Sequence, residues 1–193
     1  MTLENTNFTG HLLIAMPNLT DLFFDKSFTL IFTHNQDGAM GIVINRPTDM
    51  SFGTLFEKIN LNLHDKALTE RPVLYGGPVQ PERGFVLHQQ VGDWDSSITI
   101  IDDIAVTTSK DILTAVAEGS GPKKLMLSLG YAGWGAGQLE REISQNAWLS
   151  VKPKDHDTLI KVLFDTPHEN QLNAAMALLG FDPAMLSDVA GHA

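Results

Sequence analysis

The residues best suited to chemistry lie in two glycine-rich stretches. The first reads SLGYAGWGAGQLEREI and places Gly130 and Gly133 beside Tyr131 and Trp134, just before a helical pattern begins at Gln138. Glycines let backbone N–H groups approach an anion, and a helix N-terminus favours negative charge. The spacing matches neither the dinucleotide-binding fingerprint nor the P-loop. The stretch is therefore either a ligand-binding loop or a tight corner between two packed elements.

The second stretch reads LYGGPVQPERGFVLH, in which Gly76 and Gly77 precede a proline, and Arg83 and His88 follow. Arg46 lies beside another proline, in INRPT. An arginine at a turn can present a two-pronged donor to a carboxylate or phosphate. The alternative is that each arginine forms an internal salt bridge with one of the 23 acidic residues.

The two stretches together predict one concave site for a small anionic or nucleotide-like ligand. Tyrosine and tryptophan can both wall a pocket and hydrogen-bond its occupant. The predicted ligand-binding residues are Arg46, Gly76, Gly77, Arg83, His88, Gly130, Tyr131, Gly133, Trp134 and Gln138. The alternative is a hydrolase in which His88 is the base and glycine-loop amides form an oxyanion site. The sequence around Ser128 lacks the nucleophile elbow G-x-S-x-G, so the binding hypothesis is preferred.

Composition narrows the kinds of site and partner. The absence of cysteine excludes disulfides, thiolate nucleophiles and thiolate metal sites. The seven histidines form no H-x-H or H-E-x-x-H pair, so no metal site and no cofactor are predicted. The net charge is −10, and no basic cluster is longer than Lys123–Lys124. Direct nucleic-acid binding is therefore not expected, and the expected partner is a small ligand or another protein.

The N-terminal region carries no targeting signal of a recognised kind. It has Glu4 but no basic segment, and its apolar run Leu12–Met16 is too short for a signal peptide or a membrane span. We therefore expect a cytoplasmic protein with no membrane association.

Alternating apolar residues predict strands in hairpin-like pairs. An Asp37–Gly38 pair between two such runs is a strong hairpin signal, and Asp102–Asp103 forms a second predicted turn. Leu125, Leu127 and Leu129 are expected in a strand deep in the core. The predicted strands cover residues 10–17, 27–34, 39–47, 71–79, 83–89 and 123–130, with two more within 96–109.

Helical spacing predicts helices that are concentrated later in the chain. Thr108 and Asp111 fit a capping box for a helix over 109–119. The other predicted helices cover 51–61, the segment with Leu139, Ile143 and Ala147 on one face, 156–164, and 169–180 with a stripe of Leu172, Ala175, Met176 and Leu179 before Gly180.

These elements predict a single domain over residues 1–193, with an ordered core at about 10–186 and a frayed tail at 187–193. Hairpins followed by helices favour an α/β fold of α+β type. The expected architecture is a curled or closed mixed, mainly antiparallel β-barrel with helices packed outside.

Several stretches in register resemble one family. In order, they are GHLLIAMPNLTDLFF, HNQDGAMGIVINRP, LYGGPVQPERGFVLH, TTSKDIL, LGYAGWGAGQLEREI and NAWL, which span about Gly10 to Leu149. They resemble the AlgH/YqgE family of bacterial proteins. The resemblance implies a single-domain α/β protein on a closed mixed sheet with helices outside, and no catalytic residue or cofactor can be carried over from the family. The family name points to transcriptional regulation, and the acidic charge favours an indirect role through a protein partner.

Overall fold

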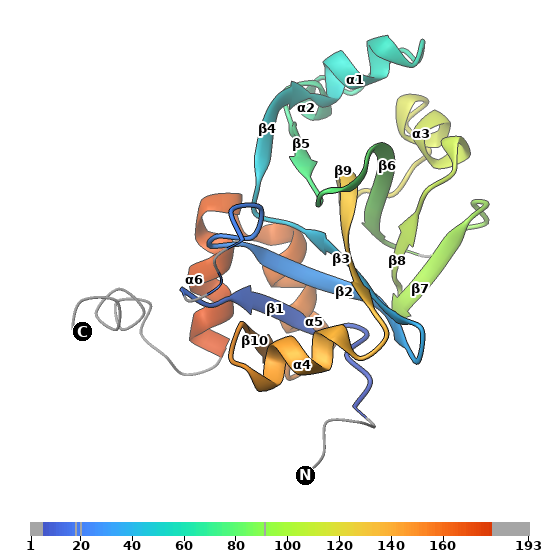
Figure 1. The fold of residues 1–193 in the computed structure, drawn as a ribbon. Helices are drawn as coiled ribbons and strands as arrows, with labels where there is room; N and C mark the ends of the chain where they lie inside the picture. Colours follow the sequence, from blue (N-terminus) through green and yellow to red (C-terminus); the bar gives the residue numbers. More distant parts are fainter. Residues whose placement is uncertain (1–5, 18, 20, 91, 179–193) are drawn as a thin grey trace.

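A strongly curled sheet of ten strands forms the centre of the molecule (Figure 1). The computed structural model describes residues 6–17, 19, 21–90 and 92–178. The main path of the sheet runs in the order β10-β1-β2-β3-β9-β6-β8-β7. Its strands are β10 (Trp148–Val151), β1 (Leu12–Ala15), β2 (Phe28–Asn35), β3 (Gly38–Val43), β9 (Leu125–Gly135), β6 (Val79–Gln89), β8 (Ile104–Thr107) and β7 (Ser97–Ile101).

Two further strands branch from this path. β4 (Pro47–Ser51) pairs antiparallel with β5 (Pro72–Tyr75), which in turn pairs parallel with β9. All other strand pairs are antiparallel, so the sheet is mixed but mainly antiparallel, as the sequence predicts. The curl leaves a half-barrel in a single-domain α/β fold.

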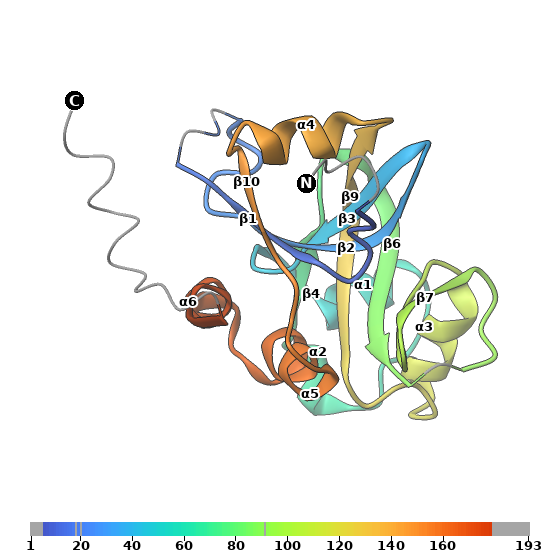
Figure 2. The same ribbon diagram turned by 90° about the horizontal axis from the view of Figure 1, so that it is seen from below.

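Helices pack around the half-barrel in separate groups: α1, α3 and α4 cover its outer face, whereas α5 and α6 contribute to the cluster inside the curl. In Figure 1, α1, α2 and α3 lie at one end of the molecule and α4 lies at the other. Figure 2 shows α5 and α6 together beside the sheet, away from α3. The helices are α1 (Phe52–Lys58), α2 (Lys66–Thr69), α3 (Lys110–Ala117), α4 (Gln138–Ser144), α5 (His156–Ile160), continued by a π-helical turn over Lys161–Asp165, and α6 (His168–Leu178). None of the described helices has both the length and the apolar character needed to cross a membrane.

Strand alternation divides the core between the two faces of the sheet. On β6, Phe85 and Leu87 pack in the cluster inside the curl, whereas Val86 belongs to the cluster beneath α1 and α3. On β9, Leu125 and Leu127 join Val86, and Met126 joins the inner cluster. The predicted central strand is thus confirmed. Leu129 is only half-buried, because it packs at the border of its cluster.

The hairpins form where the turn residues predict them. Asn35 pairs with Gly38 in the β2–β3 hairpin, and Ile101 pairs with Ile104 across the Asp102–Asp103 turn. Gly38 has a φ of +134°, and a β-carbon there would lie 2.1 Å from the Trp134 carbonyl oxygen. Glycine is therefore needed both for the turn and for the approach of β9.

Three sequence predictions about local structure are corrected. The N-cap of α3 is Ser109 rather than Thr108, and the Ser109 hydroxyl donates to Asp95 O instead of capping the helix. The glycine stretch after Gly130 is mostly strand rather than loop, because β9 continues to Gly135 by pairing with β3. Ala147 lies beyond the end of α4.

The sequence analysis did not identify two of the strands, and part of its prediction for the C-terminal end can be compared with the structure. Strands β4 and β10 were not predicted, since each is short and β4 has no buried residue to reveal its alternation. In the last helix Ala175 and Met176 are buried as expected. Leu179, Gly180 and the tail 187–193 lie outside the described residues.

Candidate functional site

The two glycine stretches lie against each other, as the sequence predicts. Val79 pairs with Tyr131 across β6 and β9. A β-carbon on Gly76 would lie 2.2 Å from Gly130 O, and one on Gly77 would lie 2.2 Å from the Tyr131 carbonyl carbon. These glycines therefore allow two backbones to cross in contact, and the space beside them is filled by protein.

The polar residues of the first stretch hold α4 to the sheet. Trp134 is buried, and its Nε1 donates to Glu142 Oε2 over 2.8 Å. Gln138 Nε2 donates to Glu142 Oε1 over 2.8 Å, and Gln138 Oε1 accepts from Gly135 N. Trp148 Nε1 also donates to Glu142 Oε2, so one carboxylate accepts from both indoles. This cluster fixes the packing of α4 on the sheet.

Tyr131 and Gly133 are two residues apart on β9 and therefore face the same side of the sheet. The half-buried Tyr131 ring packs against Phe85 at a centroid distance of 5.5 Å. Gly133 is exposed, and a β-carbon there would lie 3.3 Å from Tyr131 Cε2. Among the predicted binding residues of this stretch, Gly133 is exposed and Tyr131 and Gln138 are half-buried. A role of Tyr131 and Gly133 in ligand binding stays a prediction.

The two predicted arginines contact neutral oxygens. Arg46 donates to the carbonyl oxygens of Phe23 and Asp25, which ties down the loop that contains them. Arg83 Nη2 donates to Thr108 Oγ1 over 3.2 Å, and its guanidinium lies over the Phe85 ring at 5.5 Å. Among the described residues neither arginine forms a salt bridge, so the internal ion pairs proposed as the alternative are not found.

His88 is fully buried and both ring nitrogens have partners. Nδ1 lies 3.0 Å from Gln90 O, and Nε2 lies 2.9 Å from Thr107 Oγ1. A carbonyl oxygen only accepts, so Nδ1 carries the proton and Nε2 accepts from the Thr107 hydroxyl when the ring is neutral. Burial lowers the pKa of His88, and the hydrogen bond to Gln90 opposes this in part. Thr107 is also fully buried, so this pair offers no exposed nucleophile for the hydrolase alternative.

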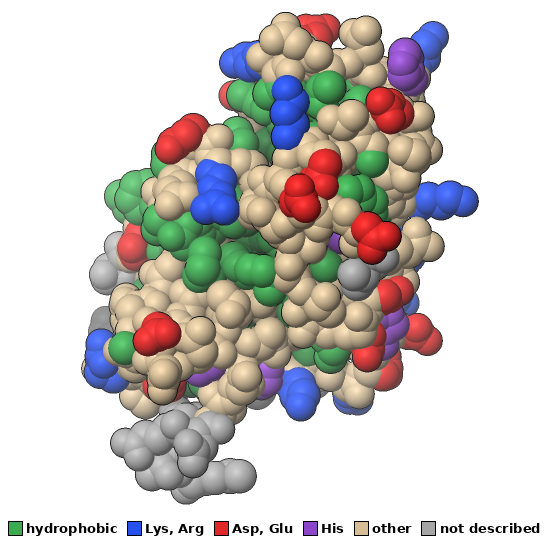
Figure 3. Space-filling model, turned by 90° about the vertical axis from the view of Figure 1, so that its right-hand side faces the viewer, with side chains coloured by type: hydrophobic (Ala, Val, Ile, Leu, Met, Phe, Trp, Pro, Cys, Tyr) green, Lys and Arg blue, Asp and Glu red, His purple; other side chains and the backbone are tan. Residues whose placement is uncertain are grey.

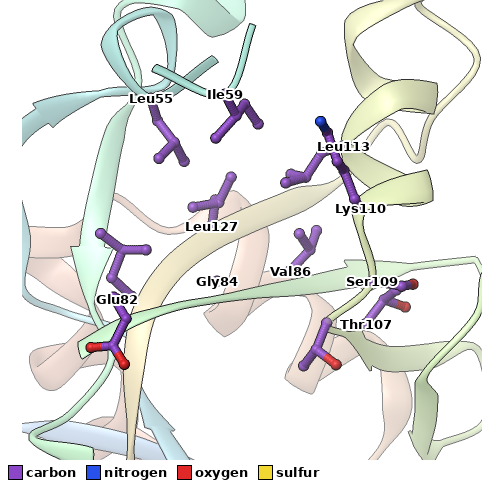
Figure 4. Close-up of a pocket in the computed structure, with 12 residues that line it drawn as sticks. Leu55, Ile59, Glu82, Gly84, Val86, Thr107, Ser109, Lys110, Leu113 and Leu127 are labelled. Atoms are coloured by element: carbon purple, nitrogen blue, oxygen red, sulfur yellow. The ribbon is translucent and has the colours of Figure 1, made fainter. Parts of the chain in front are cut away.

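A recess opens between α1 and α3, over the strands that carry both glycine stretches (Figure 4). Its volume is about 160 Å³. We call it the α1–α3 recess. Its apolar walls are Leu55, Ile59, Val86, Leu113, Leu127 and Leu129, and its polar rim is Glu82, Thr108, Ser109 and Lys110. Gly84 and the buried Thr107 also line it.

Gly84 opens the floor of this recess. It lies in β6 opposite Leu129, and a β-carbon at Gly84 would meet no atom within 4 Å. Its backbone is not in the left-handed region, so the turn geometry does not demand glycine. A glycine within a strand often marks a place where a ligand or another backbone approaches. Here the missing side chain leaves open space.

The rim of the recess carries charges of both signs. Figure 4 shows Glu82 and Lys110 on opposite sides, with Ser109 and Thr107 below Lys110. Lys110 is exposed and begins α3, so its ammonium group adds to the partial positive charge of that helix end. Arg83 adds a further cation at the rim through its contact with Thr108.

The structure thus brings the predicted stretches together but places the open space beside them. Arg83 touches the rim, and His88 lies behind the wall through Thr107. Arg46, Trp134 and Gln138 serve other contacts. The sequence analysis missed the helix residues Leu55 and Leu113, and the available signal was the isolated Gly84 in a strand. No described group of histidines and carboxylates could hold a metal ion.

Comparison with known proteins places the chain in a family. The architecture just described is a half-barrel with helices packed around it. Residues 12–184 match the AlgH-like family (DUF179), and the chain belongs to that family.

Relatives of known sequence cover the whole chain. A UPF0301 protein of Chromobacterium violaceum is 50% identical over 99% of this chain and 100% of its own length. A UPF0301 protein of Azoarcus sp. is 50% identical over 100% of both chains. The solution structure of the AlgH protein from Pseudomonas aeruginosa superposes with a TM-score of 0.78 at 43% identity, covering 98% of this chain and 97% of that one. A crystal structure of a protein from Corynebacterium diphtheriae (TM-score 0.63, 18% identity, 87% and 84% coverage) shares the fold.

Proposed function

We propose that the protein is a small-molecule-binding domain with a regulatory role, in which the α1–α3 recess takes an apolar group that carries an anionic end. The bound ligand would alter how the domain engages a protein partner, and any effect on transcription would be indirect. The net charge of −10 supports a protein partner rather than nucleic acid.

The open floor at Gly84 carries this proposal. The recess volume of about 160 Å³ is close to the ~150 Å³ of an engineered apolar cavity that binds benzene. A ring or a branched aliphatic group therefore fits between Leu113, Leu127 and Leu129. A whole nucleotide does not fit the apolar part, so a phosphate or carboxylate would remain at the rim.

The rim favours an anion on one side only. Lys110 and the start of α3 lie on one side of the recess, and Arg83 reaches the same rim through Thr108. Glu82 lies opposite and would repel a second negative charge. The preferred ligand is therefore a monoanion whose charged end faces α3.

Of the ligand-binding residues that the sequence predicts, Arg83 also contacts the rim of the recess. Arg83 belongs to both the predicted site and the rim, so Arg83→Ala should weaken a bound anion with little loss of stability. Tyr131→Phe tests the glycine-stretch site predicted from the sequence separately from the α1–α3 recess, because the Tyr131 ring packs against Phe85 rather than in the recess.

The first prediction is that filling the recess abolishes ligand binding. We expect benzoate and short branched carboxylates to raise the melting temperature of the unmodified chain, because a ligand bound only to the folded state stabilises it. Gly84→Val should remove this shift while the protein stays folded, since its side chain enters open space. Benzyl alcohol should give a smaller shift than benzoate, because it lacks the charge.

The control is Gly135→Val. Gly135 lies at the end of β9, where it pairs with Gly38 of β3, and it does not line the recess. A β-carbon at Gly135 would meet only Gln138 Oε1, at 3.8 Å. This variant should keep the full carboxylate shift. A shift of equal size in Gly84→Val, or no shift with any of these carboxylates in the unmodified chain, would contradict the proposal.

A further inference from the structure

β7 forms an edge of the curled sheet. It pairs with β8, and no other described strand pairs with it. Thr108 N donates to Ser96 O, so the alternating antiparallel pattern makes Ile98 and Val106 a hydrogen-bonded pair. The N–H and C=O groups of Ser97 and Thr99 consequently point away from β8, toward the free edge.

The same strand exposes large apolar side chains. Ile98 is 42% exposed and Ile101 is 39% exposed. Ile100 is the extra residue of a bulge and packs against the inner core cluster. Figure 3 shows the side of the molecule that bears α3 and β7 in Figure 1, where hydrophobic side chains are exposed between groups of acidic ones. An edge strand with free backbone groups and exposed isoleucines can pair with another chain.

Acidic residues flank this edge at both ends. Asp93 and Asp95 precede β7 and are exposed, and Asp102 and Asp103 follow it. The only described basic group in contact with these carboxylates is the imidazole of His156, with Nε2 2.8 Å from Asp103 Oδ1 and Nδ1 3.5 Å from Asp102 Oδ2. The edge therefore presents a short apolar stretch between two negative ends.

We propose that the β7 edge binds an extended segment of a partner protein as an added strand. The segment would have alternating apolar residues and a lysine or arginine at each end, so that its backbone pairs with Ser97 and Thr99 and its cations face the carboxylates.

A second copy of this chain fits the edge poorly. If two β7 strands paired antiparallel about Thr99, Asp103 of each copy would oppose Asp95 of the other. Like charges opposed across a strand pair destabilise it. The charge pattern thus selects a basic segment over self-pairing.

The test uses two capped peptides, each of alternating valine and threonine, with lysine at both ends in one and glutamate at both ends in the other. We expect the lysine peptide to shift the amide NMR signals of Ser97 and Thr99 and the glutamate peptide to leave them unchanged. Thr99→Pro removes an outward N–H without breaking the ladder to β8, and should weaken binding about tenfold or more. Thr99→Val keeps the N–H and should bind like the unmodified chain.

Each other outcome contradicts the proposal. Absence of any amide shift with the lysine peptide would show that the edge does not accept a strand. Equal binding of both peptides, or unchanged binding to Thr99→Pro, would show that the contact uses neither the charges nor the edge. A dimer that forms without peptide and is dissociated by Thr99→Pro would show self-pairing instead. Shifts confined to the α1–α3 recess would place the peptide at the other site, and the recess experiment above remains independent of this result.

Discussion

At the residue scale, the buried His88 belongs to a chain of four polar contacts that has donor protons for only three hydrogen bonds when the imidazole is neutral. The chain has four contacts, from Gln90 O to His88, to the Thr107 hydroxyl (2.9 Å), to the Ser97 hydroxyl (2.6 Å) and to Trp94 O. A neutral imidazole and two hydroxyls supply only three protons. A protonated His88 would complete the chain, but burial opposes the charge and lowers the pKa of His88.

The second prediction concerns the pH dependence of stability. Because the folded pKa of His88 is depressed, the unfolded chain binds more protons below the ordinary histidine value of about 6.5. The unfolding free energy should therefore be greatest above that pH and fall as the pH is lowered through it. His11 acts in the same direction, since burial and then Lys152 lower its pKa.

Urea titrations at several pH values between about 8 and 5 measure this slope. His88→Gln should reduce the slope, whatever its effect on stability at high pH. His64→Gln, at an exposed histidine outside the chain of contacts, is the control and should leave the slope as it is. An unchanged slope in His88→Gln would show that His88 is not the source.

At the element scale, the positions of most strands were predictable from the sequence, but the strands with which they pair were not. Alternation and the Asp37–Gly38 turn located β2, β3 and β9, because these depend on neighbouring residues. β10 was missed because its pairing with β1 joins residues that are far apart in the sequence. The N-cap of α3 shifted from Thr108 to Ser109, since the Thr108 hydroxyl is a partner of Arg83.

The candidate site shows the same limit. Local sequence revealed the glycine stretches and their approach to each other. It could not reveal the α1–α3 recess, because Leu55, Gly84, Leu113 and Leu127 come from four separate elements. Each of the leucines has the pattern of an ordinary core residue, and only the tertiary arrangement leaves a space between them.

The third prediction distinguishes glycines that pack against backbone from one that faces open space. Gly76→Ala should lower the unfolding free energy by about 3 kcal/mol or more, because its β-carbon would lie 2.2 Å from Gly130 O and the strands must separate. Gly84→Ala should change it by less than about 1 kcal/mol. Chemical denaturation of both variants measures the difference. Equal effects would mean that β5 and β9 can move apart without cost.

At the whole-molecule scale, β9 links the three core clusters. Met126 packs inside the curl, Leu127 packs beneath α1 and α3, and Trp134 packs against α4. Loss of β9 pairing would therefore expose all three clusters together. The fold has one structural centre even though its helices are in separate groups.

The fourth prediction is a single cooperative unfolding transition. Trp134 and Trp148 report on the α4 cluster, Trp94 packs with the α1–α3 cluster, and far-ultraviolet circular dichroism reports on the whole chain. In tryptophan variants that keep only Trp94 or only Trp148, fluorescence and circular dichroism should give the same midpoint. Leu127→Ala removes a fully buried side chain and should lower the unfolding free energy by about 2–5 kcal/mol, shifting both fluorescence midpoints equally. If Leu127→Ala shifted the Trp94 signal alone, the two ends of the molecule would be separate cooperative units, and β9 would not couple the recess to the face that α4 covers.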